Sequence, residues 1–344
     1  MLTENKFSKY IIYAVGEIVL VVIGILIALT LNTQKELNTN KSQIESIIIG
    51  VSKNLENDMK SVDEVIKISR EFDSLSKIVL EKKLTASDYQ GEVWNNEYIY
   101  LTRRTMEIIR FEKSGYDRLM GNIEIIPIEY NPLVEELQRV YGEEVLITTE
   151  VETDIRTYLN EIEKNLKDNY DWYSMTDSIH SQQQIDYYLS NSQYFNDVSM
   201  LQKYMIHIGD HLKDLKSAIT VAYNKIHKEL LSDKPFPEHI EQYEFAIPEE
   251  LIEYTGKYKI LKSKPNSLDT LIVKSKEHFL VISPFELSIL KQTKDKYQSP
   301  RYSEFQFHFY RDKDGEVNSL TLFYNISAAQ HKDSLRSESY QKIK

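Results

Sequence analysis

Two histidines one helical turn apart are the most metal-like feature of the sequence. His207 and His211 enclose the tripeptide Ile-Gly-Asp, and this spacing places both imidazoles on one face of a helix. Zinc accepts such a pair when a third and a fourth ligand complete its tetrahedron. His180 or His227 would supply one only if the fold brings it near. A solvated polar helix face explains the pair equally well, so we assign no metal and keep His207 and His211 as candidates.

Residues 312–315, Asp-Lys-Asp-Gly, carry the first half of a calcium-loop pattern. The remaining ligand positions and the distal bidentate glutamate of such a loop are missing from the residues that follow. Asp-Gly is also a typical hairpin turn, and this is the interpretation that we adopt.

The sequence lacks the short motifs of common catalytic sites. We find no nucleophile elbow, P-loop, glycine-rich dinucleotide turn or H-E-x-x-H zinc motif. The chain contains no cysteine, which excludes disulfides, thiol nucleophiles and cysteine-ligated zinc. We therefore expect a protein that is not an enzyme and needs no cofactor.

A cluster of aromatic residues between positions 170 and 195 could line a pocket or a protein interface. Core packing between the third and fourth predicted helices is the simpler explanation. The cluster consists of Tyr170, Trp172, Tyr173, Tyr187, Tyr188, Tyr194 and Phe195.

Composition limits the class of protein. The chain has 344 residues and a net charge of −11, which argues against nucleic acid as a partner because phosphates require a basic face. Tyrosine is abundant at 24 residues, whereas glycine and proline number only 10 and 8. This balance favours long helices over a glycine-rich catalytic fold.

Residues 10–31 form an apolar stretch of 22 residues with a single charge, Glu17. As a helix the stretch rises about 33 Å, enough to cross a hydrocarbon core of about 30 Å. It is longer than the apolar core of a signal peptide and ends without a small-x-small cleavage site. We expect an uncleaved signal-anchor, that is, a single-pass transmembrane helix.

The basic residues around this stretch give its orientation. Lys6 and Lys9 precede the stretch, and Lys35 and Lys41 follow it. Basic residues favour the cytoplasmic side, although the difference here is small. We expect an inner-membrane protein with its N-terminus in the cytoplasm and its bulk in the periplasm.

Four residues of the apolar stretch are candidates for helix packing in the membrane. Gly24 and Ala28 form a small-xxx-small pair, and Gly16 lies two turns earlier. Glu17 would cost about 2.5–3.5 kcal/mol within a bilayer, so it requires an explanation. A neutral glutamic acid or a hydrogen bond within a helix oligomer is simpler than ion transport.

Apolar residues at three-to-four spacing predict four long helices after the anchor, which suggests an antiparallel four-helix-type bundle. The first predicted helix could continue directly from the anchor. Residues 169–196 remain ambiguous between helix and loop. The predicted helices span residues 38–83, 98–120 (interrupted at Ser114-Gly115), 132–169 and 197–231.

From residue 247 onward the apolar period changes to two, which predicts a small antiparallel β domain. Strands are expected at 270–273, 278–282, 304–310 and 317–324. The whole layout is then a cytoplasmic tail (1–9), a transmembrane helix (10–31), a periplasmic helical bundle (32–232), a linker (233–246), the β domain (247–327) and a loose C-terminal tail (328–344).

Two stretches resemble an uncharacterised family of single-pass membrane proteins of flavobacteria-like Gram-negative bacteria. Residues 13–32, Y-A-V-G-E-I-V-L-V-V-I-G-I-L-I-A-L-T-L-N, are similar to the family's anchor, with Gly16, Glu17 and Gly24 at matching places. Residues 105–115 and 119–122 resemble its second signature, a threonine-led helix that runs into Ser-Gly. The resemblance implies the single-pass topology and assigns no activity.

Residues 250–258, E-L-I-E-Y-T-G-K-Y, are similar to the opening of small β domains appended to secreted hydrolases of the same bacteria. These domains carry no catalytic residues. The similarity implies an extracytoplasmic C-terminus.

Together these features predict a membrane-anchored periplasmic interaction or scaffold protein without catalytic activity. Its partners would be the lipid bilayer and either a second copy or another membrane or periplasmic protein. The alternative is a helical-bundle ligand sensor that signals through a membrane partner. A metal-dependent hydrolase around His207 and His211 is the third possibility.

Overall fold

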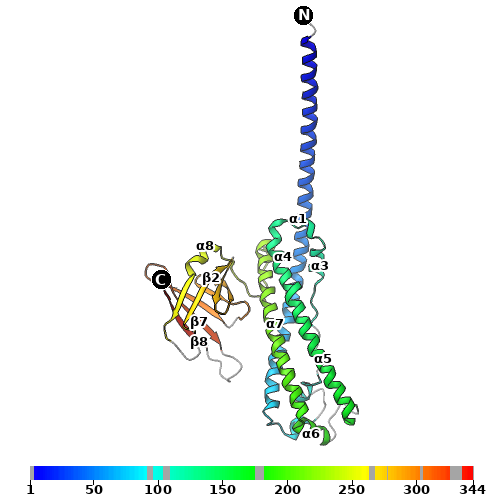
Figure 1. Ribbon diagram of the computed structural model, residues 1–344, viewed down its shortest axis with the longest axis vertical. Coiled ribbons are helices and arrows are strands. Elements are labelled where there is room, and N and C mark those ends of the chain that lie inside the picture. The colour runs from blue at the N-terminus through cyan, green and yellow to red at the C-terminus, as the bar shows by residue number, and fades with distance from the viewer. Residues whose placement is uncertain are drawn as a thin grey trace.

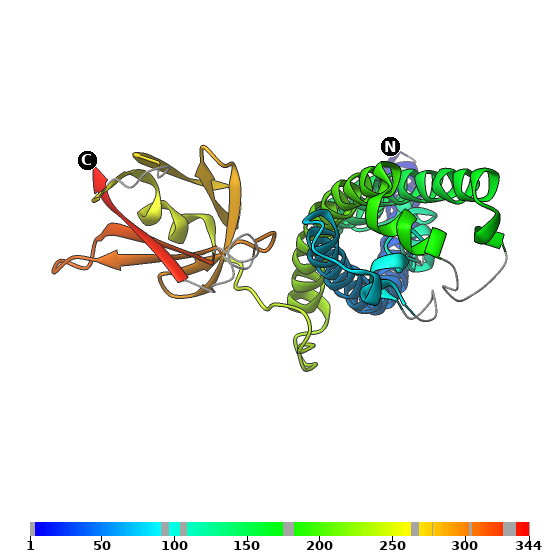
Figure 2. The same ribbon diagram turned by 90° about the horizontal axis from the view of Figure 1, so that it is seen from below.

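The computed structural model describes residues 4–90, 96–103, 109–174, 182–262, 268–276, 278–302, 305–325 and 335–343. The chain is mainly helical, begins with a long apolar helix and ends in an eight-stranded antiparallel barrel. We call the helices between residues 40 and 231 the helical part, and residues 248–343 the barrel. The barrel lies beside the helical part, as two views at right angles show (Figures 1 and 2).

Helix α1 (Glu4–Leu80) connects the apolar stretch to the core without interruption. Large apolar side chains from Tyr13 to Leu31 are 47–77% exposed, so the stretch projects away from the rest of the chain (Figure 1). From Ile44 onward the same helix buries one apolar face. The prediction that the first long helix continues from the anchor is therefore confirmed. Among the described helices, α1 alone is long and apolar enough to cross a membrane.

Two further long helices pack against the second half of α1. Helices α4 (Asn131–Gln138) and α5 (Val145–Asn169) form one helical run through the π-helical turn η5 (Arg139–Glu144). Helix α7 (Ser192–Leu230) packs along both α1 and α5. This agrees with the expected helices at 132–169 and 197–231.

The expected second helix at 98–120 is wrong. Only α2 (Glu97–Tyr100) and α3 (Ser114–Met120) form there, and residues 104–108 lie outside the described chain. Asn96 caps α2 by accepting from the backbone N–H of Tyr98 and of Ile99. The apolar spacing of this region reflects short segments that cover α1, not one continuous helix. The other short helices are η1 (Ala86–Tyr89), η3 (Ile123–Ile125), η4 (Ile128–Tyr130), η6 (Asp171–Ser174) and α6 (Gln182–Ser190).

The segment between α7 and the barrel is held in place by both of its neighbours. Asn224 of α7 accepts a hydrogen bond from the backbone N–H of Tyr243 at 2.9 Å and donates to the carbonyl of Glu241 at 2.8 Å. On the barrel side, the backbone N–H of Glu244 donates to the carbonyl of Lys291 at 2.8 Å. The expected linker at 233–246 therefore acts as a bracket that fixes the barrel beside α7. Helices α8 (Pro248–Leu251) and η7 (Ile252–Tyr254) follow it.

The barrel is a closed up-and-down meander in which every strand pairs with its neighbours in the sequence. Alternate residues point inward, so the interior is filled by apolar side chains such as Tyr258, Leu280 and Phe307. Its strands are β1 (Gly256–Ile260), β2 (Thr270–Lys276), β3 (Phe279–Ser283), β4 (Leu287–Thr293), β5 (Lys296–Gln298), β6 (Gln306–Arg311), β7 (Val317–Asn325) and β8 (Leu335–Ile343).

Strand β8 corrects the expectation of a loose tail at 328–344. It pairs with β7 and with β1, so it closes the barrel, and Tyr340 on it is only 1% exposed. Residues 328–334 and 344 lie outside the described chain. The expectation of a small antiparallel β domain at 247–327 is therefore corrected: this part of the chain is an eight-stranded barrel that extends to Ile343. Strands β2, β3, β6 and β7 lie at or near the predicted strands.

Candidate functional site

A cleft of about 920 Å³ lies between the helical part and the barrel. One wall is formed by α4, η5 and α7, and the other by the strands and loops at one end of the barrel. We call it the interdomain cleft. Ligand pockets in proteins typically have about 300–1,000 Å³ of volume, so the size suits a small molecule.

The helical wall of the cleft is charged. Helical spacing brings Glu135, Glu136 and Arg139 of one run, and Asp214 and Lys225 of α7, to the same side. Lys225 Nζ lies 2.8 Å from Glu136 Oε1, and both side chains are largely buried. A partly buried pair of this kind is fully compensated in charge, so it shapes the wall without attracting an ion.

The barrel wall of the cleft combines a group of apolar side chains with polar ones, among them Lys276, His278 and Glu286. Phe279, Leu287 and Phe305 lie half-buried at the barrel end, and the cleft extends between them to Phe307, which belongs to the barrel core. Phe285, in the loop between β3 and β4, is 57% exposed at the edge. The cleft therefore has an apolar end in the barrel and a charged end on the helices.

One ion pair crosses the cleft. The Arg301 guanidinium, which lies over the ring of Tyr302 at 5.0 Å, pairs with Asp214 of α7. Burial raises the pKa of Asp214, and the charge of Arg301 acts in the opposite direction. This pair connects the two walls directly.

Arg139 stands where α4 gives way to the π-helical turn η5. Its Nε lies 4.0 Å from Glu144 Oε1, at the limit of an ion pair, and its side chain is 48% exposed. Since guanidinium carries five N–H donors, this contact leaves most of them available to the cleft. π-Helical turns are frequent at functional sites, because they reposition side chains within a helix.

The predicted histidine pair lies outside the cleft. His207 Nε2 and His211 Nε2 are 3.3 Å apart and share a hydrogen bond. Between them, Ile208 and Gly209 face α1, and a Cβ at Gly209 would lie 2.6 Å from Ser69 Oγ. His207 is exposed and His211 is half-buried, so the pair lies on the outer side of α7, while Gly209 packs close to α1. Among the described residues, no group of three or more His, Asp or Glu side chains could hold a metal ion.

The predicted packing residues of the anchor are placed on the projecting half of α1. No described residue comes within 4 Å of a Cβ built at Gly16 or Gly24. Glu17 lies seven residues before Gly24, which puts both on one face of the helix, with Ala28 a turn further on. Within the described part of the chain, nothing packs onto the helix at Gly16 or Gly24.

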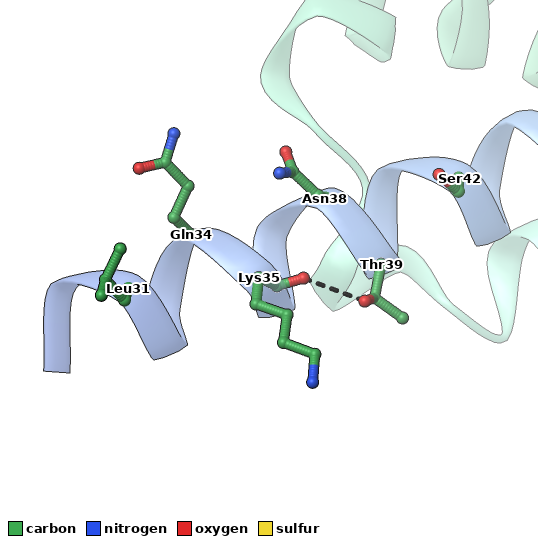
Figure 3. A pocket seen from close by; sticks show the side chains of 6 residues that line it. All are labelled: Leu31, Gln34, Lys35, Asn38, Thr39 and Ser42. Atoms are coloured by element: carbon green, nitrogen blue, oxygen red, sulfur yellow. Dashed lines mark hydrogen bonds between the residues drawn. The ribbon is translucent and has the colours of Figure 1, made fainter. Parts of the chain in front are cut away.

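A second hollow lies along α1 just beyond the apolar stretch (Figure 3). After Leu31 its side chains are polar, and Thr39 Oγ1 donates to the carbonyl of Lys35 at 2.9 Å. Since all its residues come from one helix, the hollow cannot enclose a ligand. We regard it as the polar neck between the apolar stretch and the helical part.

The aromatic cluster is core, as the simpler explanation predicted. Tyr188 and Tyr194 are 1% and 0% exposed, and Tyr89 of η1 stacks on Tyr188 at 5.5 Å. The cluster joins η1, α6 and the start of α7, so it closes the end of the helical part that is remote from the apolar stretch (Figure 1).

Sequence reasoning missed the interdomain cleft altogether. Its walls come from residues near 135, 214–225 and 279–322, which no local motif connects. The one indication of a cleft in the sequence was the number of aromatic residues at 279–307. A barrel whose interior is already filled does not need aromatic side chains at its rim.

Comparison with known proteins gives one match. The family model described as a family of unknown function (DUF6090) matches residues 17–94, which cover most of α1 and the segment after it. No curated protein and no solved structure matches the chain. The similarity therefore concerns the apolar stretch and the first helix of the core, and the matched residues include neither the cleft nor the barrel.

Proposed function

We propose that the protein is a membrane-anchored interaction protein without catalytic activity. In this proposal the apolar stretch of α1 spans the inner membrane, and the helical part and barrel stand in the periplasm. The helical part is a bundle that presents the barrel to partners, and the anchor associates with a second copy or another membrane protein.

The observation that carries this proposal is the continuity of α1. One helix joins an exposed apolar stretch to a buried core face, so a contact made in the membrane is transmitted rigidly to the helical part. The mostly polar neck, residues 32–43, separates the two by about 18 Å of helix. Figure 3 shows its first part.

The test is a pull-down of the full chain from native membranes in mild detergent, with and without Glu17→Leu. We expect a membrane partner or a second copy to be recovered with the natural chain and lost with the variant. Thr30→Leu is the matched control, since Thr30 Oγ1 already bonds within the helix to the Leu26 carbonyl at 2.8 Å. Crosslinking that recovers only monomer in every sample would contradict the proposal.

A second candidate function, ligand sensing, is favoured by the interdomain cleft. Its walls belong to two parts joined by a bracket, so a bound molecule would change how the barrel sits on α7. The test is binding of the neutral apolar dye N-phenyl-1-naphthylamine to the full chain in nanodiscs. Phe285→Ala should weaken it, because Phe285 lies exposed at the cleft edge. Equal binding to the variant would remove this candidate.

A further inference from the structure

We propose that the interdomain cleft binds an apolar molecule that carries a single carboxylate, with the apolar body at the barrel end and the carboxylate on the guanidinium of Arg139. The inference rests on the proposed ligand-binding role of the cleft and names the class of ligand.

The apolar half of the argument comes from the barrel wall. Phe279, Leu287 and Phe305 line it, and the cleft reaches Phe307 and Leu322, which are 1% and 4% exposed. A polar ligand would lose its hydration here without gaining hydrogen bonds in return. Aliphatic or aromatic groups instead gain by leaving water.

The charged half of the argument comes from the way in which the charges of the helical wall are paired. Glu136 is paired with Lys225, and Asp214 with Arg301, so these four charges compensate one another. Among the described residues, Arg139 forms no ion pair closer than the 4.0 Å contact with Glu144, and its charge also acts on Asp214. Lys276 of β2 lines the cleft as well, but its exposed side chain carries a point charge without a planar fork. A planar fork of N–H donors matches a carboxylate in bidentate geometry, which makes Arg139 the natural position for that group.

The same wall selects against a second negative charge. Glu135 lies one turn before Arg139 on α4 and lines the cleft, as does Glu286 on the barrel side. Either carboxylate would repel a dianion placed near Arg139. A monoanion satisfies Arg139 and leaves these acids in contact with water.

Long-chain fatty acids and aromatic acids share this chemistry, so the experiment includes both. Titration calorimetry of the full chain in lipid nanodiscs, with empty nanodiscs as blank, compares decanoate, decanol and decylammonium, and then biphenyl-4-carboxylate. We expect decanoate to bind at least about tenfold more tightly than decanol, and decylammonium more weakly than both. A preference between the two acids identifies the chain-like or the aromatic source.

Three variants locate the carboxylate. Arg139→Gln should weaken decanoate about tenfold and leave decanol unchanged. Arg139→Lys retains the charge but loses the fork, and should give an intermediate affinity. Arg118→Gln on α3, exposed and outside the cleft, is the matched control and should change neither. Circular dichroism verifies that each variant is folded.

Two results would overturn the inference in different ways. In the first, decanoate and decanol bind with equal affinity, and both affinities are unchanged by Arg139→Gln but weakened by Phe285→Ala. This result would reject the carboxylate as part of the ligand and retain the cleft as a ligand site. Affinities that Phe285→Ala also leaves unchanged would reject both the inference and the ligand-sensing function on which it rests.

Discussion

Asp58 is a carboxylate within the core of the helical part. It is 1% exposed, accepts a hydrogen bond from the backbone N–H of Glu112 at 2.9 Å and accepts another from the Tyr141 hydroxyl at 2.9 Å. Burial nevertheless raises the pKa of Asp58 to about 6 from its ordinary 3.8. The two hydrogen bonds act in the opposite direction without cancelling the effect of burial.

Asp58→Asn should remove a pH dependence of stability. Because the folded state holds the Asp58 proton more tightly than the unfolded state, the contribution of Asp58 is complete below about pH 4 and is lost as the pH rises through about 6. The natural chain should therefore lose up to about 3 kcal/mol relative to the variant between pH 4 and pH 7.

Denaturant unfolding of both chains at four pH values between 4 and 7 checks this expectation. Glu64→Gln, on the same helix and exposed to solvent, is the control. A constant difference between Asp58→Asn and the natural chain across that range would show that Asp58 titrates normally.

The histidine pair and Arg139 show what a sequence motif can and cannot predict. The spacing of His207 and His211 correctly placed both imidazoles on one helix face. It could not indicate that Gly209 between them packs close to Ser69, which is far away in the sequence. Nothing in the sequence around Arg139 indicated a binding site, because the cleft that Arg139 lines forms only where the barrel packs opposite to it.

The bracket between α7 and the barrel depends on Asn224. Its side chain is 4% exposed and serves both the N–H of Tyr243 and the carbonyl of Glu241. Asn224→Ala should leave both backbone groups buried without this partner, at a cost of about 1–3 kcal/mol, and should release the segment locally. Hydrogen exchange of residues 239–246 should accelerate.

Asn224→Asp is the informative companion variant. It retains the acceptor for the Tyr243 N–H but loses the donor to Glu241, so exchange at Tyr243 should be faster than in the natural chain and slower than in Asn224→Ala. Unchanged exchange in both variants would mean that Asn224 does not hold the bracket.

A second prediction about a single element concerns the contribution of strand β8 to the stability of the barrel. Tyr340 fills the barrel interior and donates to Glu338 at 2.7 Å, whereas the neighbouring Gln341 is exposed. Tyr340→Ala should destabilise the barrel by about 3–5 kcal/mol, and Gln341→Ala by less than about 1 kcal/mol. Thermal unfolding measures both.

Similar small effects from the two β8 variants would indicate that the end of the chain is loosely attached, as its sequence alone suggested.

The elements differ in how well the sequence predicts them. Long helices with a continuous apolar face, α1 and α7 above all, are predictable because burial repeats every three to four residues. Strand β4 was missed because buried and exposed residues do not alternate along it. Leu290 is also buried, at 2% exposure, although it lies outside the barrel core cluster. Strand β8 was missed because, among its residues whose burial the structure describes, Tyr340 alone belongs to the barrel core.

At the scale of the whole molecule, the proposed functions depend on two separate surfaces. In our proposals the face of α1 that carries Glu17 and Gly24 meets the membrane, and the interdomain cleft holds a ligand. Since α7 packs on α1 and also forms a wall of the cleft, a ligand that shifts the barrel acts on the same helix pair that continues into the anchor. The sequence indicated the face of α1, because its small residues and Glu17 recur at helical spacing, but it could not indicate the cleft, which forms only where the barrel packs on the helical part.

The projecting half of α1 should be dispensable for folding. Its apolar side chains up to Leu31 are largely exposed, and the buried face begins only at Ile44, so a chain that starts at Glu36 retains every core contact. Glu36 also places a negative charge at the new helix start, where the helix dipole favours it. We expect this shortened chain to remain soluble without detergent, with an unfolding midpoint within about 3 °C of the full chain in nanodiscs. In cells the full chain should resist alkaline extraction from membranes, and the shortened chain should not pellet with them. A shortened chain that aggregates, or that unfolds at a much lower temperature, would show that the apolar stretch packs against the protein itself and would contradict the role of α1 as an anchor.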